Sequence, residues 1–330
     1  MQKTLRGSVV MATTPTIASF LIVLACVLST HRTICCAASR EPASLPEKKF
    51  TTIGTDWGSS SRHARRRAEE ALPLHRMDEQ DRQAIQQSLQ STTLYRRLPV
   101  ELFVCDGNLL GFSLDKPETI VDIWRLLGIS RLSLDPTGPD QWQFADGYGT
   151  VGQLQLAYRE RKQTGGMLVF HGKGAYKGPL SPKNLTGGCV LIIRYREAEP
   201  TVDGRLRQAI QVDAFLDMDG IGLEIVTRTL QPLIARSAAA NLHEICLFMS
   251  SLSDAAASNP EGVARLANRL KRTVPIDRQA LATIARETAQ RQKVKTDMPI
   301  EQTPSPEQLR VDLAARWLPA NELQNLQLQQ

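Results

Sequence analysis

The alternation of apolar and polar residues over positions 208–217 predicts a β-strand, and a helical period follows it directly. Four apolar side chains occupy every second position of this strand: Ile210, Val212, Ala214 and Leu216. A period of two places them on one face of a sheet. From Ile221 to Leu252 the apolar residues recur every three or four positions, which is the spacing of one face of a long helix. Pro232 removes one backbone donor inside this helix and predicts a kink or a restart.

Short alternating segments before this strand predict an antiparallel sheet. Turns that contain glycine or proline separate the segments, and short connections join antiparallel strands. We expect strands over residues 141–145, 151–161, 167–171, 188–197 and 207–217. Charged residues at alternate positions, such as Arg159 and Arg194, indicate that one face of the sheet meets water. The predicted fold class is therefore α+β, with an antiparallel sheet covered on one face by a long C-terminal helix and followed by shorter helices.

The flanking segments predict shorter elements. Residues 106–108 have the composition of a turn between two strands, 100–105 and 109–114. A helix with Pro117 in its first turn follows and ends at Gly128. We also expect helices over residues 77–94, 260–270 and 275–284, a last short helix after Ser305, and a strand over 130–134 that ends in a turn at 135–138.

The N-terminus has the pattern of an export signal. Lys3 and Arg6 precede an uncharged apolar run, Ile17–Leu28, and residues 36–38 are small enough for a cleavage site. We expect a cleaved signal peptide and an exported protein, periplasmic or extracellular. The alternative is an uncleaved membrane anchor, because residues 9–28 are together long enough to span a bilayer.

The composition divides the chain into four parts. Residues 1–38 form the signal peptide or membrane anchor, and residues 39–75 are expected to be a disordered linker because they have no apolar period. The α+β domain spans residues 76–290, and residues 291–330 form a polar tail with one short helix. The arginine run at 65–67 in the linker is either solvated or in contact with an anionic membrane surface.

The charge and the aromatic content argue against nucleic acid as a partner. The net charge is +6, and removal of residues 1–38 would leave 37 basic and 34 acidic residues, a net charge of +3. So small an excess does not make the strongly basic surface that phosphate backbones require. Aromatic residues make up 5% of the chain, too few to predict a base-stacking surface.

Three cysteines, Cys105, Cys189 and Cys246, lie in the predicted domain. An odd number permits one disulfide with a leftover thiol, and the alternative is three buried small apolar residues. Their spacing fits no metal-binding knuckle, so we expect neither a metal nor a cofactor. Cys26 ends a loose lipobox, which would make it a lipid-anchor site, although the apolar run continues beyond it.

The segment from His171 to Gly178 is a candidate anion-binding loop. Its glycines could turn backbone amides toward an anion, and four side chains could contact the ligand: His171, Lys173, Tyr176 and Lys177. The segment lacks the G-K-[ST] ending of a P-loop, so a hairpin loop with glycines for turn geometry is the alternative.

An acidic cluster is the other candidate site. Asp213, Asp217 and Asp219 could hold a divalent ion where the strand passes into the helix. Position 215 is Phe215, so the segment does not match a calcium loop, and Asp219 could instead cap the helix. His243-Glu244 is only half of the H-E-x-x-H motif, and no G-x-S-x-G motif occurs.

The order of elements over Leu98–Leu252 resembles the helix-grip fold of START and polyketide-cyclase-like domains. The shared order is a strand pair, a helix, a run of antiparallel strands and a long C-terminal helix. In that family the sheet curls around the long helix and a gap between them holds a hydrophobic ligand. The resemblance implies a cavity and carries over no functional residue.

These patterns favour an exported or membrane-tethered, non-catalytic binding domain, whose ligand is an apolar small molecule or an envelope protein. One alternative is an envelope hydrolase that uses acids such as Asp213 or Asp217, marked by a strongly shifted pKa in a cleft. Another is a structural protein whose helices at 260–270 and 275–284 pack in an assembly, marked by an exposed apolar patch.

Overall fold

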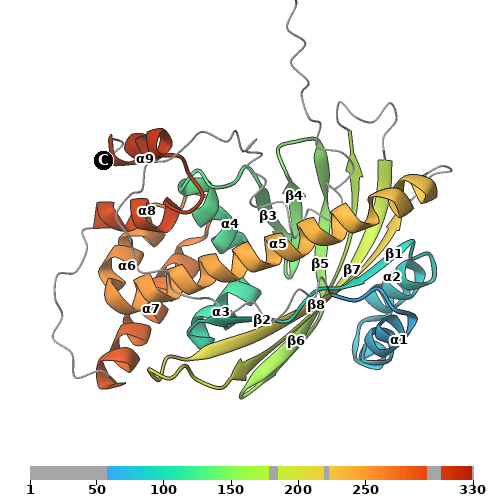
Figure 1. The fold of residues 1–330 in the computed structure, drawn as a ribbon, viewed down its shortest axis with the longest axis horizontal. Coiled ribbons are helices and arrows are strands. Elements are labelled where there is room, and N and C mark those ends of the chain that lie inside the picture. The colour runs from blue at the N-terminus through green and yellow to red at the C-terminus, as the bar shows by residue number, and fades with distance from the viewer. Residues whose placement is uncertain (1–57, 178–184, 219–222, 296–305, 329–330) are drawn as a thin grey trace, which may run out of the picture.

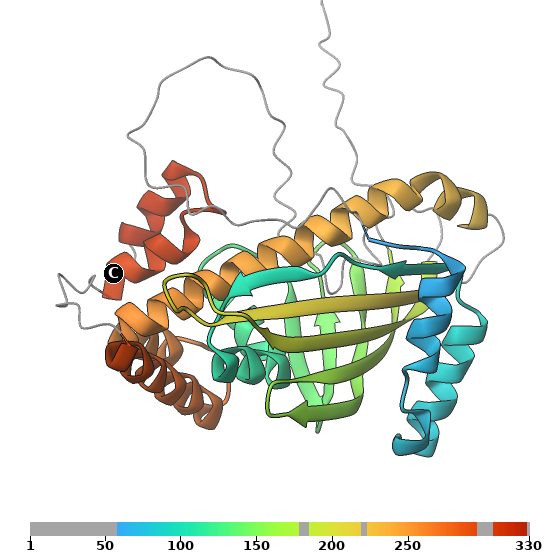
Figure 2. The same cartoon turned by 60° about the horizontal axis from the view of Figure 1, so that its bottom comes forward.

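An eight-stranded antiparallel sheet curves around one long helix in the computed structural model (Figures 1 and 2). The structure describes residues 58–177, 185–218, 223–295 and 306–328, so the expected export segment and Asp219 lie outside the described residues. The strands are β1 (Leu94–Arg97), β2 (Glu101–Val104), β3 (Ser133–Gly138), β4 (Gln141–Ala145), β5 (Thr150–Lys162), β6 (Gly165–Tyr176), β7 (Leu185–Ala198) and β8 (Arg207–Met218). The predicted α+β class is confirmed.

The sheet has the order β1-β8-β7-β6-β5-β4-β3, and β2 also pairs with β8. β1 pairs with the C-terminal half of β8, starting at Leu94↔Leu216, while β2 pairs with the N-terminal half and ends at Val104↔Arg207. Pro99 lies between β1 and β2, where its missing N–H interrupts the ladder. Consecutive strands from β3 to β8 pair with one another, and a register shift near Leu156 adds to the bend of β5.

Helix α5 (Leu223–Ser258) crosses the concave face of the sheet (Figure 2). Its predicted apolar stripe is buried, with Leu242, Met249 and Leu252 in the main core. The helix is one element through Pro232, so the predicted restart is wrong. A proline removes a single hydrogen bond at a cost of about 3 kcal/mol, and the burial of the stripe over the following turns offsets this loss.

Two short helices, α3 (Gly107–Asp115) and α4 (Pro117–Leu126), join β2 to β3. The expected strand over 109–114 is instead α3. The Asp106 side chain accepts hydrogen bonds from the amides of Asn108 and Leu109, so the residues that read as a turn form a helix N-cap. The second helix was predicted correctly, and Gly128 follows it with a φ of +73°.

The outer face of the sheet, the face away from α5, is partly covered by helices α1 (Arg62–Glu70) and α2 (Glu79–Gln90) (Figure 1). A second core lies between these helices and the sheet and includes Ala68, Ile85, Val169, Ile192 and Phe215. This arrangement corrects two expectations: part of the linker is helical, and only part of the outer face meets water. The apolar face of α1 consists of Ala64 and Ala68 among arginines. Two alanines make too weak an apolar pattern to predict a helix.

Four helices form a C-terminal layer at one end of α5: α6 (Pro260–Asn268), α7 (Pro275–Lys295), α8 (Pro306–Ala314) and α9 (Ala320–Leu328). The stripes of α6 and α7 are buried as predicted, with Leu266 and Leu281 in the main core. Leu309, Leu313 and Trp317 belong to the same core. The polar tail expected over 291–330 therefore contains two packed helices rather than one.

Strand ends differ from the prediction where glycine or proline indicates a turn. β3 continues through residues 135–138, and the turn comes at Asp140, which has a φ of +54°. β6 extends to Tyr176 through Gly172 and Gly174. A Cβ at Gly174 would lie 3.4 Å from Cζ of Phe144 and only 2.9 Å from the Val151 carbonyl oxygen, so glycine serves close packing there.

Candidate ligand pocket

An apolar pocket lies between α5, the α3–α4 pair and the concave face of the sheet. Its volume is about 140 Å³. The sheet contributes one wall, formed by Phe103, Leu134, Leu154, Phe170, Ile193, Ile210 and Val212. Ile193 and Val212 are direct cross-strand partners on β7 and β8. The period-two pattern that predicted the strands therefore also builds this wall.

Helices α3, α4 and α5 form the opposite wall, and their lining residues share the same spacing along each helix. Leu242, Ile245, Cys246 and Met249 of α5 line the pocket at positions i, i+3, i+4 and i+7. Pro117, Ile120, Val121 and Trp124 repeat this spacing on α4, and Leu110, Ser113 and Leu114 begin it on α3. Each helix thus turns one apolar stripe toward the same space.

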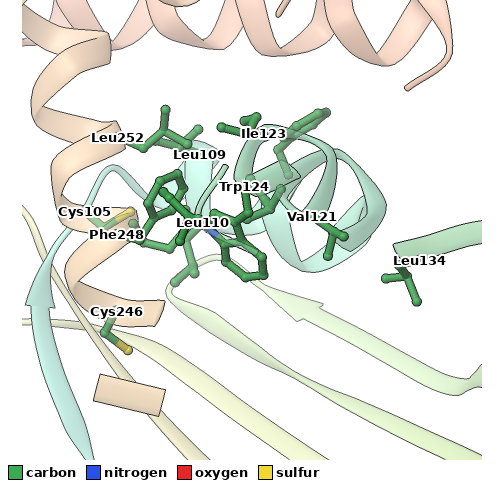
Figure 3. Packing of buried hydrophobic residues seen from close by; sticks show 14 of the residues in the cluster. Cys105, Leu109, Leu110, Val121, Ile123, Trp124, Leu134, Cys246, Phe248 and Leu252 are labelled. Carbon is green, nitrogen blue, oxygen red and sulfur yellow. The ribbon is translucent and has the colours of Figure 1, made fainter. Parts of the chain in front are cut away.

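Aromatic rings pack behind Trp124 and support the pocket wall. Figure 3 shows Trp124 of α4 beside Phe248 of α5, and their ring centroids are 5.7 Å apart in an edge-to-face arrangement. Phe248 also contacts Trp317, with centroids 5.6 Å apart. The Trp124 indole nitrogen is fully enclosed and has no hydrogen-bond partner, so it offers no donor to the pocket. Aromatic pairs of this kind stabilise a wall beyond the area that they bury.

The lining carries almost no polar chemistry. The Ser113 hydroxyl already donates to the backbone carbonyl of Leu109 at 2.8 Å. Cys246 is the one ionisable side chain among the lining residues, and burial, aided by the nearby Glu101 carboxylate, raises its pKa well above the usual value. The thiol is therefore protonated at neutral pH and is a poor nucleophile. A charged ligand would lose its hydration here without compensation.

Two polar pairs flank the pocket. His243 Nδ1 lies 3.0 Å from Glu101 Oε2, which ties α5 to β2. This hydrogen bond raises the pKa of His243. On the other side, the Trp142 indole donates to Glu118 Oε2 at 2.8 Å, and burial raises the pKa of Glu118. Both pairs are internally satisfied, so they hold the walls rather than contact a ligand.

The candidate anion-binding residues do not converge. His171 lies on the outer face, where its Nε2 is 2.9 Å from Asp81 of α2. Lys173 and Lys177 are exposed, whereas Tyr176 is buried. The segment through Tyr176 is a strand rather than a loop, and alternation sends His171 and Tyr176 to opposite faces.

The acidic residues also lie on the outer face, opposite the pocket. Asp213 is fully buried and accepts hydrogen bonds from Tyr95 Oη at 2.6 Å, Arg97 Nε at 2.8 Å and Arg194 Nη1 at 2.5 Å. Asp217 accepts from Ser91 Oγ at 3.1 Å. Within the described ranges, no group of three or more His, Cys, Asp or Glu side chains could hold a metal ion. Asp213 is thus the centre of a structural ion-pair network.

The three cysteines of the described residues are free, as expected of small buried residues. Cys105 and Cys246 are fully buried, and Cys189 is partly buried. Burial raises the pKa of Cys189 to about 12. These thiols behave as apolar packing groups.

The sequence pattern does not predict the α3 part of the pocket, because the apolar residues of 109–114 also fit a strand. The signal was present: Leu110, Ser113 and Leu114 have helical spacing, and Asp106 precedes them as an N-cap.

No helix in the described ranges has both the length and the apolar character needed to cross a bilayer. Comparison of the chain with protein-family models, curated proteins and solved structures gives no match.

Proposed function

We propose that this protein is a non-catalytic binding protein that holds a small, neutral, apolar molecule between α5 and the concave face of the sheet. The observation that carries the proposal is the pocket of about 140 Å³ with no charged residue in its lining. An engineered apolar cavity of about 150 Å³ in another protein binds benzene. The size therefore suits a single ring or a short branched chain.

The arrangement of the elements supports the helix-grip resemblance as part of this proposal. The sheet curves around α5, and the α3–α4 pair closes the space between them (Figures 1 and 2). A cavity in this position is what the resemblance implies. The proposal also includes export, by a signal peptide in residues 1–38 or an anchor at residues 9–28, because of the basic and apolar pattern there.

The pocket chemistry favours binding over the hydrolase alternative. Cys246 is buried with a raised pKa, and Asp213 is neutralised by two arginines on the opposite face of the sheet. The assembly alternative has less support, because the apolar stripes of α6 and α7 pack into the main core.

A thermal-shift experiment with toluene tests the proposal. Toluene should raise the Tm of the wild-type protein saturably, since a ligand that binds only the folded state stabilises it. Val212→Phe places a ring in the pocket and should abolish the rise. Val151→Phe on β5 is the matched control, because Val151 is 49% exposed and does not line the pocket. Native mass spectrometry, followed by extraction of the bound material, would identify the natural ligand class.

An absent Tm shift in the wild-type protein, or an equal shift in Val212→Phe, would overturn the binding proposal.

A further inference from the structure

Ser113 differs in chemistry from the rest of the pocket lining. Among the described residues that line the pocket, it alone has an oxygen in its side chain. It lies on α3 with Leu110 three positions before it and Leu114 directly after it, and both also line the pocket. This spacing places the three side chains on one face of the helix, so the Ser113 hydroxyl lies on the face that meets the pocket.

The hydrogen of this hydroxyl is already engaged. Ser113 Oγ donates to the backbone carbonyl oxygen of Leu109, one turn earlier on α3, at 2.8 Å. A serine hydroxyl has two acceptor lone pairs in addition to its single hydrogen, so this bond leaves Oγ able to accept. Ser113 therefore offers the pocket a hydrogen-bond acceptor and no spare donor.

The other polar groups of the lining add little to this chemistry. The Trp124 indole nitrogen is fully enclosed, and the Cys246 side chain is a thiol, which is a weak hydrogen-bonding group. A ligand carbonyl could accept from Ser113 only by taking its hydrogen from Leu109, an exchange of one hydrogen bond for another. A ligand hydroxyl adds a hydrogen bond instead, because it donates to an oxygen that can still accept.

We propose that the pocket ligand is a small apolar alcohol or phenol whose hydroxyl donates to Ser113 Oγ. This inference rests on the proposed function of the pocket and names the chemical class that the pocket selects. A hydroxyl buried without a partner weakens binding about tenfold or more, so a wholly apolar pocket rejects alcohols. Ser113 is then the residue that determines specificity for the hydroxyl.

Phenol and toluene test the proposal, because a hydroxyl and a methyl group of similar size occupy the same position on one ring. A phenolic hydroxyl has a pKa near 10, so phenol is neutral at pH 7. Both compounds are titrated calorimetrically into the full chain. The wild-type protein should bind phenol about as tightly as toluene, because the hydrogen bond to Ser113 offsets the hydration that phenol loses.

Ser113→Ala should bind phenol about tenfold more weakly than the wild type and toluene within about twofold. Alanine favours helices, so this variant should fold. Ser251→Ala is the matched control. Ser251 of α5 donates to the carbonyl of Leu247, also one turn earlier, at 3.1 Å, and it is not a lining residue. This control should bind both compounds as the wild type does.

The outcomes separate this inference from the proposed function. A wild-type protein that does not bind toluene would overturn the proposed function and the hydroxyl site with it. A wild-type protein that binds toluene at least tenfold more tightly than phenol would overturn the hydroxyl site alone. So would a Ser113→Ala variant that keeps its affinity for phenol or loses both ligands equally, since Ser113 would then serve only the structure of α3.

Discussion

Asp213 shows how a single residue holds the outer face of the sheet together. Its carboxylate is the common acceptor for Tyr95, Arg97 and Arg194, which come from strands on both sides of β8. Arg97 and Arg194 both compensate the buried negative charge of Asp213. Burial and the hydrogen bond to this carboxylate raise the pKa of Tyr95. Removing one member of such a network leaves the others unmatched.

We therefore expect Asp213→Asn to lower the free energy of unfolding by about 2–4 kcal/mol, because two arginines lose their counter-charge while the side-chain volume stays the same. Urea denaturation would measure this. Asp217→Asn is the control four residues further along the same face of β8, where Ser91 is the donor to the carboxylate among the described residues. Equal stabilities of the two variants would show that the network contributes nothing measurable.

At the scale of elements, the pair His243–Glu101 fastens α5 to the sheet edge. The folded-state pKa of His243 is raised, so the protonated imidazolium stabilises the fold. This contribution is fully present below the unfolded pKa of about 6.5 and is lost as the pH rises through the higher folded value.

We accordingly expect stability to fall as the pH rises above about 6.5, by less than about 1 kcal/mol because His243 keeps part of its solvent contact. His243→Gln should flatten this part of the curve, measured as the urea midpoint against pH. His63→Gln on α1, which is exposed, should leave the curve unchanged. A steeper fall in His243→Gln than in the wild type would contradict this account.

The elements also show what the sequence could and could not predict. β4 was predicted to the residue because Trp142 and Phe144 alternate with glutamines, and alternation is a local property. α3 was missed because a mostly apolar segment such as residues 109–114 fits a strand or a helix until the Asp106 cap is seen. The glycine pattern predicts a turn at Gly174, whereas the role of this glycine depends on the Val151 carbonyl and on Phe144, which lie on other strands.

For the whole molecule, the pocket could be predicted only as a consequence of the resemblance. The stripe of α5 and the strand alternation are local and were predicted. The position of α4 against the α5 stripe and the sheet depends on contacts between residues far apart in the sequence, and no local pattern specifies these contacts. The C-terminal layer is a further example, because Trp317 contacts Phe248, which in turn contacts Trp124 of the pocket wall.

The last prediction follows from this connection. Trp317→Ala should lower the free energy of unfolding by about 3 kcal/mol, since a large buried ring leaves a cavity. It should also weaken toluene binding, because Phe248 loses the ring that supports it against Trp124. Trp317→Phe keeps an aromatic contact and should retain most of the affinity, although it loses the indole donor to Glu244. Urea denaturation gives the free energy of unfolding, and titration of the same samples with toluene gives the affinity. If Trp317→Ala is destabilised but binds toluene like the wild type, the C-terminal layer stabilises the fold without shaping the pocket.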